Sequence, residues 1–402
     1  MKKYIDIILL VLMGMLSFSS LASYVSQNYL HISLSAPEVF FIPLFLLLKH
    51  KFEPIRFDKD TFAKLIILLV LLVLWSQVLG TYPLYSVLSS ARGYLYLFLF
   101  YCIYKKNSSF DKVTLILICF GSIIGWFITS YFNFQLLISD TTQGHQDYGN
   151  MITVALFIIY TIMLKRWKLF AVGFVMILGI CIFSGIRRVI FVVLLAMAAA
   201  VLIQVLVSKK SIIKQALFVG IIFIPIYFAL PLLEQQIEEL SPILHMRLFE
   251  KTEQLMEGDM SSGDDFRKTH IEAFFNNPLD NMIPKGMVSN QYLSDKGTGI
   301  FMDFPLFALA HMFGFIIALF IVAYYLIKGY KSFLLYKITK DENVGATAIL
   351  SVIFFSLLFV EGSFLVYPFA TPFTGMFLGR MVFYARQYDI RRRRLGLSEV
   401  GV

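Results

Sequence analysis

Long runs of apolar residues, separated by short polar segments, cover most of the chain. A run of about 20 apolar residues forms a helix long enough to cross a hydrocarbon core of about 30 Å. The pattern therefore predicts an all-α polytopic membrane protein with about twelve transmembrane helices. The apolar runs lie at residues 5–25, 37–49, 62–80, 83–104, 113–131, 149–164, 169–185, 188–207, 212–232, 303–327, 344–360 and 363–385.

The longest polar interruption is residues 234–302, which carry twelve acidic and six basic side chains. We predict transmembrane helices over 1–233, one large loop over 234–302, further transmembrane helices over 303–385 and a basic tail over 386–402. Within the loop, Ser262 and Asp265 have the spacing of a capping box. They predict an amphipathic helix over 265–275, whose apolar side lies on the membrane surface.

Lysine and arginine residues fall at every second boundary between the apolar runs, and they end in a cluster over 386–394. Short loops rich in these residues stay on the cytoplasmic side. We therefore expect both termini to be cytoplasmic and the loop 234–302 to face outward, into the periplasm of a bacterial inner membrane. The net charge of +9 then gathers on the inner leaflet, where anionic lipid attracts it, and no nucleic-acid partner is predicted.

Composition supports the membrane assignment and limits the chemistry. The chain is 58% hydrophobic and 15% charged, against roughly 45–50% and about 25% in soluble domains. The three cysteines, Cys102, Cys119 and Cys181, all lie inside apolar runs, so no disulfide framework is predicted. No metal-ligand spacing is present in the sequence, and we expect no metal or other cofactor. Lys2 and Lys3 before an apolar core also fit a cleavable signal, which would leave the later orientation unchanged.

Three arginines stand where charge is costly. Arg92 lies well inside the run 83–104, and Arg187 and Arg188 form an outward turn at the start of the run 188–207. A charge inside the bilayer marks a functional site by default, and a helix N-terminus with guanidinium groups suits a phosphate. The alternatives are a structural Arg92 held by backbone carbonyls, and an arginine pair bound to outer-leaflet lipid phosphate.

The outward segments carry the remaining candidates. Arg267 and His270 are neighbours on the predicted loop helix, Asp303 begins the next span, and the smaller segment 139–150 contains polar groups suited to sugar hydroxyls. These groups are His145, Asp147 and Tyr148. Each set also has a simpler interpretation: a solvated helix face, a helix cap and an ordinary polar turn.

The order of these features resembles the O-antigen and capsule polysaccharide polymerases (Wzy-type), within the group that also holds the O-antigen ligases. The resemblance covers residues 140–330 and rests on a set of short motifs: Ser184, Gly185 and Arg187 opening a span, the large loop, Arg267 with Phe274, Asn277-Pro278-Leu279 followed by Gly286, and Asp303 with Gly314. The family's compact Pro-Leu-x-Gly-x-Gly is stretched here over 278–286. Ligases usually have a histidine at the position of Asp303.

The resemblance implies a metal-independent membrane glycosyltransferase of lipopolysaccharide or capsule biosynthesis. Its substrate would be an undecaprenyl-pyrophosphate-linked glycan at the periplasmic face, and a chain-length regulator protein is an expected partner. Arg187, with Arg188 or Arg92, would hold the pyrophosphate, and Arg267 would add a lid contact. Asp303 would orient or deprotonate the acceptor hydroxyl, while His270, His145, Asp147 and Tyr148 would contact the glycan or close over it.

Two alternatives remain open. An O-antigen ligase would use a similar arrangement to transfer the glycan to lipid A core. A lipid-linked oligosaccharide flippase would also suit about twelve spans, but it predicts internal symmetry and charges spread through the bilayer midplane. The sequence instead places its charges at the outer face beside one large loop.

Overall fold

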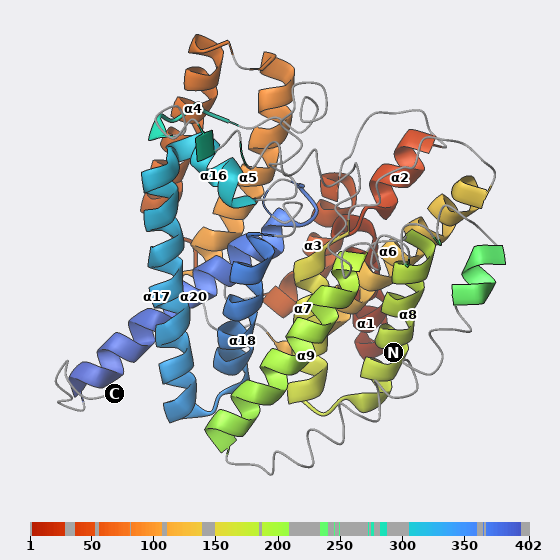
Figure 1. The fold of residues 1–402 in the computed structure, drawn as a ribbon. Helices are drawn as coiled ribbons and strands as arrows, with labels where there is room; N and C mark the ends of the chain where they lie inside the picture. Colours follow the sequence, from red (N-terminus) through yellow and green to blue (C-terminus); the bar gives the residue numbers. More distant parts are fainter. Residues whose placement is uncertain are drawn as a thin grey trace. The chain divides into compact units, whose positions relative to one another are not determined.

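The computed structural model describes nine long stretches of the chain and several short ones. The long stretches are residues 2–28, 37–52, 56–80, 82–106, 111–138, 149–184, 187–208, 305–359 and 367–394. The short ones are 234–239, 275–276 and 282–287, with single residues 245, 249, 272 and 365. The regular secondary structure throughout these residues is helical, which confirms the predicted all-α class (Figure 1).

The helices fall into two compact units, and each is described by itself. Unit 1 comprises Met1–Phe45 and Ile116–Thr269, and unit 2 comprises Leu46–Leu115 and His270–Val402. Two helices, α3 (Pro37–Phe52) and α6 (Lys112–Ile138), run across the divisions in the sequence. The other helices of unit 1 are α1 (Lys2–Ser17), α2 (Leu21–Asn28), α7 (Met151–Met163), α8 (Trp167–Ser184) and α9 (Arg187–Ser208).

Unit 2 joins an early part of the chain to its last part. The orange helices α4 (Lys59–Val78) and α5 (Leu84–Tyr104) belong with the blue helices of the C-terminal part in Figure 1. Helix α20 packs against α5, α17 and α18. The C-terminal helices are α16 (Pro305–Phe313), α17 (Phe315–Thr339), α18 (Glu342–Leu357) and α20 (Thr371–Arg394).

Five of the described helices are long and apolar enough to cross a membrane: α4, α5, α6, α8 and α17. Large apolar side chains cover the outer faces of two of them, as with Leu71 and Leu74 of α4 and Phe320 of α17, which is 71% exposed. A protein in water rarely presents such a face. These helices are consistent with a protein embedded in lipid.

Two of the predicted spans are interrupted. The run 5–25 divides into α1 and α2, because the Ser19 hydroxyl donates to the carbonyl O of Met15 at 2.5 Å and accepts from the Leu21 N–H. The run 303–327 divides at Gly314, whose φ of +81° disfavours any residue with a side chain. A Cβ there would also clash with the carbonyl O of Met282. Helix α20 continues through residues 386–394, the first part of the predicted basic tail.

Glycines allow close contact between helices inside each unit. In unit 1, a Cβ at Gly14 of α1 would clash with the carbonyl O of Ile118, and one at Gly121 of α6 with that of Val11. In unit 2, Gly375 and Gly379 of α20 face the backbone of α5 at Leu97 and Tyr101 in the same way. Small residues four apart let two backbones approach closely in a membrane. The increasing numbers on both helices show that α5 and α20 run parallel.

Candidate functional site

The first candidate site is the turn between α8 and α9 in unit 1. Helix α8 ends at Ser184, whose hydroxyl donates to the carbonyl O of Ile180 at 2.6 Å, and α9 begins at Arg187. Arg188 is half-buried, and the next residue, Val189, is completely buried. Arg187 is at the predicted helix start, while its side chain lies outside the described part of the structure. Arg188 thus lies in the first turn of α9, next to the helix start.

An aromatic cluster fixes the end of α8 that leads into this turn. The ring of Phe183 lies 5.2 Å from Phe134, 5.5 Å from Tyr131 and 5.6 Å from Phe127, measured between centroids. All three partners belong to α6, so the end of α8 is fixed against the C-terminal part of that helix. The first N–H groups of a helix have no partner within the helix and favour an anion, and Arg188 adds a positive charge near the start of α9. The arrangement is chemically suited to a phosphate group.

Arg92, the second candidate, lies on α5 in unit 2 and is half-buried. Its neighbours Ala91 and Tyr94 belong to a buried apolar cluster that also contains residues from α4, α16 and the long loop. Arg92 is therefore next to a packed apolar interior. A charged side chain is costly in such surroundings. We call Arg187 and Arg188, at the start of α9, the arginine turn. Arg92 belongs to unit 2, whereas the arginine turn belongs to unit 1.

One part of the long loop packs on unit 2, at the end of α4 and beside α16. In segment 282–287, the carbonyl O of Pro284 accepts a 2.7 Å hydrogen bond from the Trp75 indole N–H. The Met287 N–H donates to the Ser76 hydroxyl at 2.5 Å, and the Lys285 N–H donates to the carbonyl O of His311 at 2.8 Å. The segment is thereby attached to both α4 and α16.

Lys285 and His311 were not predicted as a pair, and the segment brings them together. Both side chains are half-buried, and the His311 ring lies 6.1 Å from that of Tyr82. The signal was weak in the sequence, because only Gly286 marked this part of the loop as unusual. Gly286 has a φ of +89°, which favours glycine. A Cβ at this position would also clash with the Ser76 side chain.

The opposite end of unit 2 carries acidic and basic residues that hold helix ends together. The Asp58 carboxylate caps α4 and lies 3.2 Å from the Lys105 ammonium and 3.3 Å from that of Lys106. Burial raises the pKa of Asp58, but hydrogen bonds from Thr61, Lys105 and Lys106 outweigh it and lower the pKa to about 2. These contacts fix the start of α4 against the end of α5.

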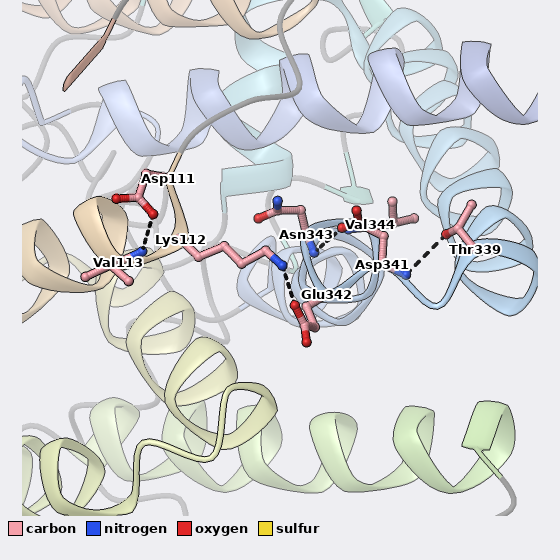
Figure 2. A network of polar contacts seen from close by, with 8 residues as sticks. All are labelled: Asp111, Lys112, Val113, Thr339, Asp341, Glu342, Asn343 and Val344. Carbon is pink, nitrogen blue, oxygen red and sulfur yellow. Dashed lines mark hydrogen bonds and ion pairs between the residues drawn. The ribbon is translucent and has the colours of Figure 1, made fainter. Parts of the chain in front are cut away.

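A second ion pair lies between helix starts. Figure 2 shows Lys112, at the start of α6, reaching Glu342 at the start of α18. Asp341 caps α18 by accepting from the Asn343 N–H at 2.7 Å. Residues of two regions predicted to be cytoplasmic are therefore at one end of unit 2. This lysine-rich end is structural in character rather than a site for chemistry.

The side chain of Arg380 lies in a different environment from the one that its position in the sequence suggests. Its position near the end of an apolar run suggests a side chain that extends toward the inner membrane surface. In the structure it is only 2% exposed, and its guanidinium carbon lies 5.5 Å from the Tyr104 ring centroid. Gly379 explains the burial, because the close approach of α20 to α5 leaves Arg380 enclosed between the helices. The contact with an aromatic face is a favourable one for a cation.

The six remaining predicted site residues lie outside the described part of the structure. They are Arg267, His270, Asp303, His145, Asp147 and Tyr148. Helical residues at 272 and 275–276 fall at the end of the predicted loop helix and just beyond it. Within the described residues, no group of three histidine, cysteine, aspartate or glutamate side chains is arranged to hold a metal ion. No protein-family model, no curated protein and no solved structure matches this chain.

Proposed function

We propose that the chain is a membrane-embedded glycosyltransferase that polymerises undecaprenyl-pyrophosphate-linked oligosaccharide repeat units. The product would be O-antigen, capsule or a related polysaccharide, made at the periplasmic face of a bacterial inner membrane. The observation that carries the proposal is the half-buried Arg188 at the start of α9, beside the turn that follows Ser184. Backbone N–H groups at a helix start and a guanidinium group together suit a phosphate.

The proposed reaction needs no metal. The acceptor hydroxyl oxygen attacks the anomeric carbon of the donor glycan, and the bond from that carbon to the pyrophosphate oxygen breaks. The lipid pyrophosphate leaves with the bonding electron pair, and Asp303 takes the proton of the hydroxyl. Arg187, with Arg188 or Arg92, would stabilise the charge that develops on the leaving group. Arg267 and His270 would close over the site, and His145, Asp147 and Tyr148 would contact the glycan.

The proposal includes the topology expected from the sequence. About twelve spans, cytoplasmic termini and an outward loop 234–302 would place the arginine turn and segment 282–287 at the periplasmic face. Anionic membrane lipid would contact the lysine-rich end, and a chain-length regulator protein would be a partner. The five long apolar helices support a membrane location in general.

The test is the length of the polysaccharide in cells from which the gene has been deleted. Expression of the natural chain should restore long chains on a gel of extracted polysaccharide. Arg187→Ala, Arg188→Gln and Asp303→Ala should leave single repeat units, while Lys59→Gln, an exposed residue at the lysine-rich end, should behave as the natural chain. If Arg187→Ala and Asp303→Ala both restore long chains, the assignment of the site is wrong.

The same gel separates a ligase from a polymerase, and a glycosidase assay on spheroplasts identifies a flippase. Loss of an O-antigen ligase would remove all glycan from the lipid A core, whereas loss of a polymerase leaves one repeat unit attached. Loss of a flippase would leave lipid-linked repeat units on the cytoplasmic side, where an externally added glycosidase cannot reach them in spheroplasts. Either pattern would overturn the polymerase proposal.

A further inference from the structure

One face of α6 in unit 1 is polar although the helix is long and apolar enough to cross a membrane. Ser122, Trp126, Thr129 and Asn133 follow one another at intervals of four, three and four residues, which places them on one side of the helix. All four are at least nine-tenths buried. We call these four residues the α6 polar face.

Part of this face is explained by helix packing. The Ser122 hydroxyl donates to the carbonyl O of Phe18 at 2.6 Å and lies 3.2 Å from the hydroxyl of Thr153. The Thr129 hydroxyl donates to the carbonyl O of Gly125 at 2.9 Å. Serine and threonine commonly join membrane helices in this way. These two residues need no ligand.

Trp126 packs against Gly149, but packing leaves one polar atom of Trp126 and one of Asn133 unexplained. Trp126 is 1% exposed and Asn133 is 5% exposed. Within the described part of the chain, the Trp126 indole N–H has no acceptor and the Asn133 side-chain oxygen has no donor. Leaving a buried polar atom unsatisfied costs about 1–3 kcal/mol. Two such atoms, one a donor and one an acceptor, on one face indicate a missing polar partner.

The surroundings define what kind of partner fits. Residues 122–133 contain no charged side chain, so the face itself offers no counter-charge and suits a neutral partner. Beside the polar face lie the rings of Phe127, Tyr131 and Phe134, packed around Phe183. Tyr131 is 42% exposed, so the aromatic cluster is open at its edge. Phe183, at the centre of the cluster, is next to Ser184, the last residue of α8.

We propose that the α6 polar face, with the open edge at Tyr131, binds a sugar residue of the glycan whose diphosphate is held at the arginine turn. A sugar offers hydroxyl donors and acceptors together with apolar C–H faces. The sugar hydroxyls can donate to the Asn133 oxygen and accept from the Trp126 N–H. The C–H faces of the sugar can pack against aromatic rings. This inference rests on the proposed function and assigns Trp126, Asn133 and Tyr131 a role in recognising the glycan.

The experiment measures sugar binding by the full-length chain, purified in detergent, with titration calorimetry. The probe is a set of oligosaccharides released by mild acid from the surface polysaccharide of the cells that make the chain. Trp126→Phe removes the N–H and keeps the aromatic shape, and Asn133→Leu removes the acceptor. Each should raise the Kd for the oligosaccharide about tenfold, which corresponds to about 1.4 kcal/mol. Binding of inorganic pyrophosphate should be unchanged.

Matched controls separate a binding role from loss of folding. Trp167→Phe changes an exposed tryptophan on α8, and Asn343→Leu changes an asparagine of unit 2. Both should bind the oligosaccharide as the natural chain does. If Asn133→Leu does not fold, Trp126→Phe decides the question alone. Natural affinity in Trp126→Phe, or no binding by the natural chain, overturns the inference and leaves water as the occupant of the face.

The two proposals fail in different ways. Sugar binding that depends on Trp126, together with unchanged polysaccharide length in the deletion strain, would refute the polymerase and keep the glycan site. Loss of long chains on deletion, together with natural sugar binding in Trp126→Phe, would keep the polymerase and refute the glycan site.

Discussion

The Trp75 indole N–H donates a 2.7 Å hydrogen bond to the carbonyl O of Pro284 and thereby ties the end of α4 to the long loop. The Ser76 hydroxyl, next along the chain, accepts from Met287 at the other end of the same segment. Segment 282–287 is therefore fixed at two points on one helix. It gives the loop a defined return to unit 2.

Gly286 should be essential for this attachment. Gly286→Ala combines an unfavourable φ of +89° with a clash against the Ser76 hydroxyl. Gly80→Ala is the matched control, because Gly80 also has a positive φ, +61°, but nothing lies within 4 Å of its Cβ position. We expect Gly286→Ala to lower the free energy of unfolding by about 2–3 kcal/mol and Gly80→Ala by about 1 kcal/mol. Thermal unfolding in detergent measures both, and equal effects would contradict the packing at Ser76.

The Asp58 cluster should make stability depend on pH. Because folding lowers the pKa of Asp58 from 3.8 to about 2, the ionised carboxylate stabilises the folded chain above about pH 4, and this stabilisation is lost as the pH falls through 2. The shift corresponds to roughly 2 kcal/mol. Asp58→Asn should lower the melting temperature at pH 7 and flatten its decrease between about pH 4 and pH 2. Asp60→Asn, an exposed neighbour, should keep the slope of the natural chain.

The glycine contact between α5 and α20 should tolerate no added bulk. Gly375→Leu would force the α20 backbone away from the carbonyl O of Leu97, and overpacking of this kind costs about 1–3 kcal/mol or more. Ala323→Leu adds similar bulk at an exposed position on α17 and should have little effect. The yield of monodisperse protein after extraction and its melting temperature report the difference. Similar values for the two variants would count against close packing of these helices.

The Lys112–Glu342 ion pair should contribute little energy, because the side chains are 30% and 42% exposed. A double-mutant cycle with Lys112→Gln and Glu342→Gln should give a coupling energy of about 1 kcal/mol or less. Increasing salt should reduce that energy further, because exposed charges are screened. A coupling energy above about 2 kcal/mol would show that the pair is more deeply buried than these exposures indicate.

The sequence predicted the helical class and most helix positions, because long apolar runs report directly on burial in lipid. It could not predict the break at Ser19, which depends on local hydrogen bonds of its hydroxyl that an apolar run does not reveal. Nor could it predict the break at Gly314, which depends on the carbonyl O of Met282, far away in the sequence. For the same reason Arg380 was expected to extend toward the membrane surface, whereas α5 encloses it. The sequence singled out the turn at Arg188 and the charge at Arg92, but the pairing of Lys285 with His311 arises only when segment 282–287 packs on α4.

The parallel contact of α5 with α20 has a consequence for biosynthesis. Helix α5 emerges from the ribosome early, and its partner is among the last helices to be made. Until then the backbone around Leu97 and Tyr101 lacks the glycine surface that covers it in the finished protein. Unit 2 can therefore complete its interior only after translation has reached α20, and chains interrupted before that helix should be targets for membrane proteases.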